Sequence, residues 1–184
     1  MKLLLLADRE PTKPLNEIID SNPWIDLIVL LWDLYYMDIQ PLKDYPNIPK
    51  IWVYGNHCDW IYMDELWITN MHLNTFELNW ITFGWFEWCV RYKDAKFQYT
   101  QEMAEELIKS LPKVDILVCH CPPFWINDDQ SDHAHIWYKA TLNYINEYKP
   151  KYLFHWHTYD NWNFVDKYGE TNIVYVHREK ILEI

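Results

Sequence analysis

Five short segments with the composition of buried β-strands each lead directly into polar residues. The segments are 3–7, 25–31, 50–54, 115–119 and 151–154. The segment 25–31 is apolar through Leu31 except for Asp26, which is typical of a central strand covered on both faces. In open α/β sheets, functional sites lie beyond the carboxyl ends of the strands. The polar residues that follow these five segments are therefore the candidate site.

The rest of the chain alternates between helical and extended patterns. The expected helices are 11–21, 100–111 and 138–148, and the further expected strands are 74–78, 81–83, 172–176 and 180–184. Strands alternate with helices at both ends of the chain, and a β-rich section lies between them. This order predicts an α/β fold with two packed mixed β-sheets flanked by helices. No repeat or linker interrupts it, so we expect a single domain over residues 1–184.

Composition limits the classes of partner. The net charge is −11, which argues against a nucleic-acid scaffold, although nucleic acid is not excluded as a substrate. Bound metal ions could supply the positive charge that a phosphate substrate needs. The apolar run 3–6 is too short for a signal sequence or a membrane span, so we expect a cytoplasmic protein without a membrane partner. Oligomeric state is not predicted.

The residues at the five strand ends are of metal-binding types. They are Asp8 with Glu10, Asp33, Asn56 with His57, His120, and His155 with His157. Carboxylates, an amide oxygen and imidazoles suit Mn, Fe, Zn, Ni or Mg. Taken singly, a strand-end Asp is more often a cap, and a lone His after a buried strand is more often structural. Five such ends in one chain are hard to explain in that way.

The same residues form a recognisable series of motifs. The series is Asp8-Arg9-Glu10, Trp32-Asp33, Gly55-Asn56-His57, Cys119-His120-Cys121-Pro122-Pro123 and Trp156-His157-Thr158-Tyr159. It resembles the calcineurin-like metallophosphoesterases, whose pattern is Asp-x-His, Gly-Asp, Gly-Asn-His, a lone His and Gly-His-x-His. The resemblance spans nearly the whole chain, and its Gly-Asn-His and His-x-Pro-Pro blocks are the specific parts.

The resemblance implies a centre with two divalent or trivalent metal ions, with Mn as the first expectation. Asp33 would bridge the ions, Asp8 would hold the first, and Asn56, His120 and His157 would complete the second. The motifs depart from the family mainly at the first ion. Glu10 stands where the family has His and can still bind a metal.

Two tyrosines are further candidate ligands of the first ion. Tyr159 stands where the family has its last His, and a neutral phenol is a poor ligand. Tyr36 is the other candidate, because Trp32-Asp33-Leu34-Tyr35-Tyr36 resembles the Gly-Asp-x-x-Tyr of purple acid phosphatases.

The implied activity is hydrolysis of a phosphate monoester or diester by a metal-activated hydroxide. His57 would approach the phosphate and stabilise or protonate the leaving group. Arg91, His133 and His135 either border the substrate pocket or lie in a solvated region. His155 is either a strand-end residue or a ligand. The expected partner is a small phosphoester or a nucleotide.

Two other functions remain open. A non-catalytic relative could keep the fold and one metal as a binding or scaffold module, and Tyr159 favours it. A third class, a nucleic-acid or sugar binder, would use tryptophans as stacking platforms.

The tryptophans stand where glycine is expected. The chain has twelve tryptophans and three glycines, whereas average usage predicts roughly 13 glycines. Trp32 and Trp156 occupy glycine positions of the family motifs, and Asn79-Trp80 stands where a hairpin favours Asn-Gly. Trp85, Trp88, Trp125 and Trp162 also fall in turn-like segments. UGA is read as glycine in some bacterial lineages and as tryptophan in others, so we interpret these tryptophans as glycines in the natural protein.

This interpretation predicts the mass of the protein isolated from its native organism. The intact mass should be lower than the mass calculated from the printed sequence, because glycine is much lighter than tryptophan. A mass that fits twelve tryptophans would refute the interpretation.

Overall fold

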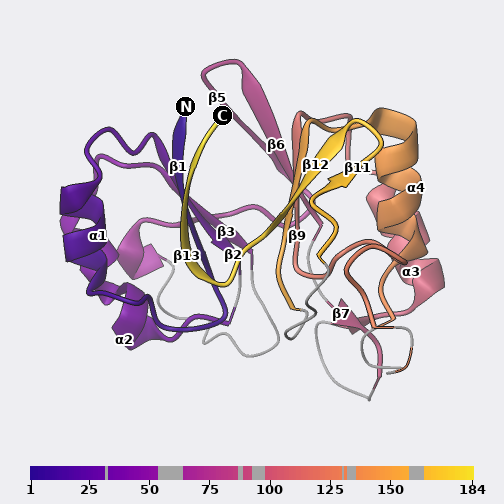
Figure 1. Cartoon of the computed structure of the whole chain (residues 1–184), viewed down its shortest axis with the longest axis horizontal. Helices are drawn as coiled ribbons and strands as arrows, with labels where there is room; N and C mark the ends of the chain where they lie inside the picture. Colours follow the sequence, from indigo (N-terminus) through magenta and orange to yellow (C-terminus); the bar gives the residue numbers. More distant parts are fainter. Residues whose placement is uncertain are drawn as a thin grey trace. The chain divides into compact units, whose positions relative to one another are not determined.

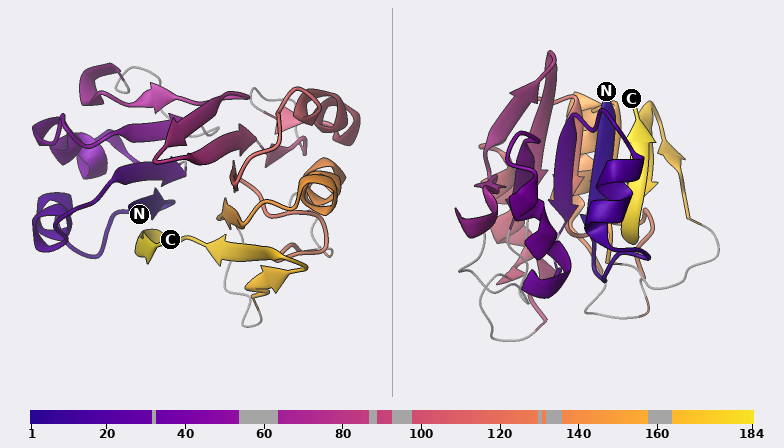
Figure 2. Two further views of the ribbon diagram at one scale, coloured as in Figure 1. Left: turned by 90° about the horizontal axis from the view of Figure 1, so that it is seen from above. Right: turned by 90° about the vertical axis from the view of Figure 1, so that its left-hand side faces the viewer.

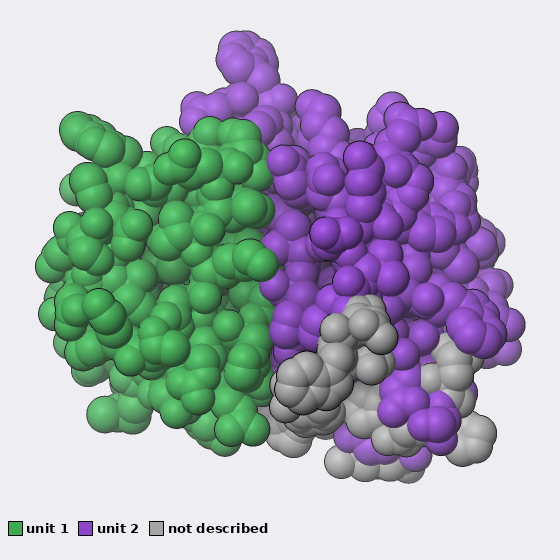
Figure 3. Space-filling model, in the orientation of Figure 1, with its two compact units in different colours: residues 1–71, 176–184 green, residues 72–175 purple. Residues whose placement is uncertain are grey.

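The computed structural model describes residues 1–31, 33–53, 64–86, 89–92, 98–129, 131, 136–157 and 164–184. The chain divides into two compact units, and Figure 3 shows each unit in its own colour. Unit 1 comprises Met1–Met71 with Val176–Ile184, and unit 2 comprises His72–Tyr175.

Unit 1 is built on a five-stranded sheet in which only the edge strand β13 is antiparallel to its neighbour (Figure 1). In spatial order the strands are β13 (Arg178–Glu183), β1 (Lys2–Ala7), β2 (Leu27–Leu31), β3 (Lys50–Val53) and β4 (Thr69–Asn70). Every residue of β2 is buried, as its apolar sequence predicts. Helix α1 (Leu15–Ser21) buries Leu15, Ile18 and Ile19 on one face. The shorter helices are α2 (Tyr36–Ile39) and the 3₁₀ segments Gln40–Asp44 and Asp64–Leu66.

Unit 2 is built on a six-stranded mixed sheet. In spatial order its strands are β11 (Lys167–Tyr168), β12 (Thr171–Tyr175), β10 (Tyr152–His155), β9 (Ile116–Cys119), β6 (Ile81–Phe86) and β5 (Thr75–Leu78). Strands β12, β10, β9 and β6 pair in parallel with one another in that order. A small pair consists of β7 (Cys89–Val90) and β8 (Gln98–Tyr99). Helices α3 (Gln101–Ile108) and α4 (Lys139–Tyr148) lie side by side against the sheet (Figures 1 and 2).

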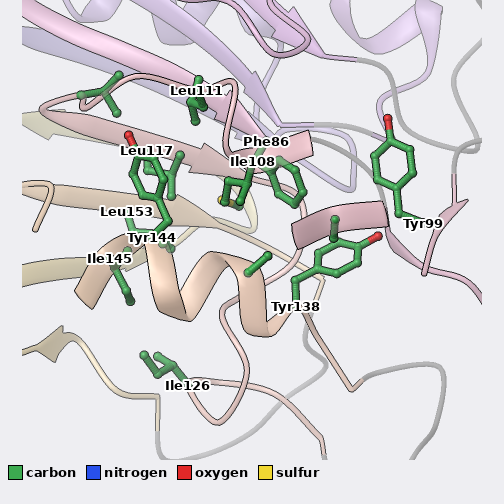
Figure 4. Close-up of a cluster of buried hydrophobic side chains, with 14 of the residues drawn as sticks. Phe86, Tyr99, Ile108, Leu111, Leu117, Ile126, Tyr138, Tyr144, Ile145 and Leu153 are labelled. Atoms are coloured by element: carbon green, nitrogen blue, oxygen red, sulfur yellow. The ribbon is translucent and has the colours of Figure 1, made fainter. Parts of the chain in front are cut away.

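The core of unit 2 joins α3 and α4 to the strands. Leu117 of β9 and Leu153 of β10 lie in the same cluster as Tyr144 of α4 (Figure 4). The Tyr144 hydroxyl donates a hydrogen bond to the Pro112 carbonyl at 2.6 Å, so its polar end is satisfied. Gly84 on β6 permits a close approach, because a Cβ there would lie 2.9 Å from the Val114 side chain.

The predicted fold class is confirmed as an α/β fold with two mixed sheets and accompanying helices. The assignment of residues 1–184 to one domain stays a prediction. No helix in the described part of the chain is long and apolar enough to cross a membrane.

The described tryptophans fall into two groups of four. Trp24, Trp67, Trp80 and Trp125 have φ between 59° and 70°, and between 68% and 91% of each residue's surface is exposed. A left-handed backbone costs an L-residue about 1–2 kcal/mol, and glycine avoids this cost. Trp52, Trp85, Trp137 and Trp156 are buried. The indole N–H groups of Trp85 and Trp156 are buried without a hydrogen-bond partner among the described atoms, at about 1–3 kcal/mol each. Glycine would remove the backbone cost at the four exposed positions and the cost of the buried N–H group at positions 85 and 156.

Replacing Trp80 by glycine should stabilise the chain. Asn79 and Trp80 both have positive φ in the turn between β5 and β6, and Trp80 is 91% exposed. Trp80→Gly therefore loses little packing and relieves strain, which should raise the free energy of unfolding by about 1 kcal/mol in denaturant titration.

Tyr35→Gly is the matched control, because Tyr35 is also an exposed aromatic residue but has a φ of −79°. It should not stabilise the chain. Equal effects of the two substitutions would contradict the assignment of strain to Trp80.

Candidate metal centre

Three of the predicted ligands have left-handed backbone conformations immediately beyond parallel strands. Asp8 follows β1 with a φ of 69°, Asp33 follows β2 with a φ of 55°, and His157 follows β10 with a φ of 63°. Each costs about 1–3 kcal/mol, and such strain concentrates at functional sites. These three residues of metal-binding type thus share a backbone conformation that is uncommon for residues other than glycine.

In unit 2, His120 and His157 lie together. Strands β9 and β10 pair in parallel, and the Trp156 amide donates to the His120 carbonyl at 3.2 Å, which extends the pairing beyond the strand ends. The two imidazole rings are 4.5 Å apart between centroids. His120 is 1% exposed, and both of its ring nitrogens are buried, as is Nδ1 of His157. Imidazole nitrogens are common metal ligands in proteins.

Aromatic rings surround this histidine pair. Trp137 lies 5.2 Å and Trp156 lies 4.7 Å from the His157 ring, between centroids, and Trp156 also makes an edge contact with His120. Both tryptophans are buried. Their rings occupy space beside the imidazoles. Glycine at 156, as the family motif has, would open that space.

The described residues contain one candidate metal-binding triad, Asp33, His120 and His157. His120 is buried, while Asp33 and His157 are half-buried. One carboxylate and two imidazoles suit a first-row ion such as Mn, Fe or Zn. The donor types therefore fit the group that the sequence motifs imply. The identity and the number of metal ions stay predictions.

In unit 1, Asp8 contacts a histidine that the sequence motifs did not identify. The His177 Nε2 lies 3.4 Å from the Asp8 carboxylate, and the Arg9 Nε lies 3.7 Å from it. Burial raises the pKa of Asp8, and the charges of His177, Arg9 and Arg178 partly oppose that rise. His177 comes just after the predicted strand 172–176, so the strand-end argument could have found it.

Glu10 and Tyr36 contact other residues in unit 1. Glu10 is paired with Arg178, since its carboxylate lies 3.8 Å from the guanidinium and its carbonyl accepts from it at 3.3 Å. The Tyr36 hydroxyl donates to Glu65 at 3.3 Å. Glu10 also raises the pKa of Asp38, although burial is the larger cause. Metal binding by Glu10 or Tyr36 stays a prediction.

Several predicted site residues lie outside the described residues. They are Asn56, His57, His133, His135 and Tyr159. Arg91 is described, is exposed, and donates from its guanidinium to the Gln98 carbonyl at 3.2 Å. Its role in substrate binding stays a prediction.

Comparisons with known proteins show the fold but not the family. No family model and no curated protein matches the chain. One crystal structure matches with a TM-score of 0.60 and 12% identity, covering 94% of this chain and 89% of the other. The crystal structure of TT1561 from Thermus thermophilus matches with a TM-score of 0.51 and 14% identity, covering 84% of this chain and 80% of the other. Identities this low establish similarity of fold alone.

The geometry predicts that His157 binds metal and that His72, which also belongs to unit 2, does not. His157→Ala should weaken Mn²⁺ binding by more than about 10-fold in titration calorimetry, since losing a ligand costs at least as much as losing an outer-shell partner.

His72→Ala is the control, because His72 pairs with the Tyr99 hydroxyl at 3.3 Å and is not in the triad. Its Mn²⁺ affinity should equal that of the unmodified protein. Equal losses in both variants would show that the effect comes from general destabilisation.

Proposed function

We propose that this chain is a metal-dependent phosphoesterase of the calcineurin-like type that hydrolyses a phosphate monoester or diester. The observation that carries the proposal is the triad of Asp33, His120 and His157. These residues occupy the strand ends at which the family motifs have metal ligands. The similarity of fold to solved structures is consistent with this proposal and does not identify an activity.

In this proposal two metal ions share the site. Asp33 would contribute its carboxylate to both ions, His120 and His157 would hold one, and Asp8 would hold the other, with Asn56 and Glu10 as further ligands. When bound, such ions lower the pKa of a water molecule and neutralise charge that develops on a phosphoryl group. Asp8, Asp33 and His157 also share a left-handed backbone conformation, which is more frequent at ligand-binding sites than elsewhere.

The negative charge of the chain supports the proposal that a phosphate substrate binds only when metal ions are present. The chain carries a net charge of −11, and Asp8, Glu10 and Asp33 bring carboxylates to the proposed site. A phosphate anion would be repelled by such a surface unless cations were bound. His57 is the proposed leaving-group acid, and Arg91, His133 and His135 are proposed contacts to a small phosphoester or nucleotide.

A non-catalytic metal-binding module is the second candidate. The packing of Trp137 and Trp156 against His157 favours it for the chain as printed, because these rings occupy space that a substrate would need. If position 156 is glycine in the natural protein, the packing of its ring no longer favours the module.

Asp33→Asn tests the proposed function. With added Mn²⁺, the variant should hydrolyse a generic aryl phosphate ester about 10²–10³-fold more slowly than the unmodified protein, which is the usual cost of losing one preorganised electrostatic group. Its bound metal should also fall, because the lost charge belongs to a shared ligand.

Asp26→Asn is the control in the same unit, because the Asp26 carboxylate accepts from the Lys2 amide at 2.7 Å and is not in the triad. Near-normal turnover in Asp33→Asn would contradict the proposal. Metal binding without hydrolysis of monoesters, diesters or nucleotides would favour the binding module.

A further inference from the structure

Asn127 lies at the centre of a buried hydrogen-bond network in unit 2. Its side-chain amide bonds to His155 and to the backbone of Val165, so it joins three segments of unit 2. The first segment follows His120, and the second leads to His157. Asn127 is 8% exposed and His155 is fully buried.

The backbone of Val165 fixes the orientation of the Asn127 amide. The Val165 N–H can only donate, and it donates to Oδ1 of Asn127 at 2.7 Å. The Val165 carbonyl can only accept, and it accepts from Nδ2 of Asn127 at 3.0 Å. The amino group of Asn127 is therefore the group that lies 3.0 Å from Nε2 of His155.

This orientation sets the tautomer of His155. Because the Asn127 amino group donates, Nε2 of His155 must accept and carries no proton. The proton of the neutral ring then lies on Nδ1, which donates to the Trp156 carbonyl at 3.2 Å. Both ring nitrogens therefore have defined partners, and the ring is held against the backbone one residue before His157.

The other ends of the network are also fixed. The neighbour of Asn127, Ile126, is buried in the core of unit 2 below α4, and its amide donates to the Pro123 carbonyl at 3.0 Å (Figure 4). Phe164 stacks on Tyr175 of β12 with 4.3 Å between ring centroids, and the Asp166 carbonyl accepts from the Ile173 amide at 2.8 Å. Asn127 thus connects two anchored segments to the end of β10.

We infer that Asn127 is a positioning residue for His157, acting through the His155 tautomer and the carbonyl of Trp156. The inference rests on the proposed metal site, because it assigns to Asn127 the orientation of one of that site's ligands. His157 has a φ of 63°, so its conformation needs support from the surrounding structure. The bond from His155 to the Trp156 carbonyl supplies such support at the peptide that precedes His157.

Asn127→Gly is the main test. The Asn127 φ of 56° suits glycine, so the substitution removes the amide without adding strain. Outer-shell partners typically change metal affinity by about 10–100-fold, and the support here is indirect, so we expect a loss of about 10-fold in Mn²⁺ affinity by titration calorimetry. Asn79→Gly is the matched control, because Asn79 has a φ of 52° in the turn between β5 and β6. The Mn²⁺ affinity of this variant should equal that of the unmodified protein.

Nitrogen NMR of the histidine rings in the metal-free protein gives a readout that stability alone would not move. The unmodified protein should show His155 with its proton on Nδ1. Asn127→Asp replaces the donor by a carboxylate that accepts, so Nε2 of His155 should become protonated, and the signals of His157 should shift. This second variant keeps the test decisive if Asn127→Gly does not fold.

The outcomes separate this inference from the proposed function. A proton on Nε2 of His155 in the unmodified protein would overturn the inference. Unchanged Mn²⁺ affinity in folded Asn127→Gly, or no metal binding by the unmodified protein, would also overturn it. If the NMR and affinity results are as expected and no phosphoester is hydrolysed, the proposed function fails and the positioning role stands.

Discussion

Parallel pairing of neighbouring strands is the constraint on which the candidate site depends. The register that aligns Leu6 with Leu30 brings the carboxyl ends of β1 and β2 to one edge of the sheet in unit 1. The pairing of Phe154 with Val118 does the same for β10 and β9 in unit 2. A polar residue placed just after each strand therefore meets its counterpart from the next strand. Burial of the apolar strands stabilises the sheets. The residues that follow each strand do not have to be apolar, so they can be metal-binding or catalytic types.

Left-handed backbone conformations have two different explanations in this chain. At Asp8, Asp33 and His157 the left-handed backbone belongs to side chains with metal-binding atoms, so the cost can be offset when a ligand is bound. At Trp24, Trp67, Trp80 and Trp125 it belongs to exposed rings that gain little from their position. The glycine hypothesis accounts for the second group, whereas the first group carries the side chains of the proposed metal site. It also accounts for the buried indoles of Trp85 and Trp156, whose N–H groups lack partners among the described atoms.

The sequence predicted the long elements well because hydrophobic periodicity determines them. The apolar run 25–31 became β2 at Leu27–Leu31, and the amphipathic pattern 138–148 became α4 at Lys139–Tyr148. The pattern at 100–111 overran α3, which ends at Ile108, because Leu111 is buried without being helical. Short elements such as α2 and β7 were not predicted, since their sequences carry no clear apolar run or period.

Site residues could likewise be predicted only where a local sequence pattern marks them. The residue types after the apolar strands, together with the family motifs, selected Asp33, His120 and His157, which the structure groups as a candidate metal-binding triad, while their roles as ligands stay predictions. Contacts made across long sequence separations were not predictable in this way. The pairing of Asp8 with His177 and the network of Asn127 depend on tertiary packing, and no local pattern encodes them.

X-ray absorption spectroscopy of the protein loaded with one Mn²⁺ or Zn²⁺ equivalent tests the central claim most directly. Binding by Asp33, His120 and His157 predicts a first shell of oxygen and nitrogen atoms with multiple scattering from two imidazoles, with Zn–N distances of about 2.0–2.1 Å for zinc. That scattering should fall to one imidazole when either histidine is replaced. A first shell without imidazole scattering, or one that is unchanged when His120 or His157 is replaced, would contradict a metal centre at these strand ends.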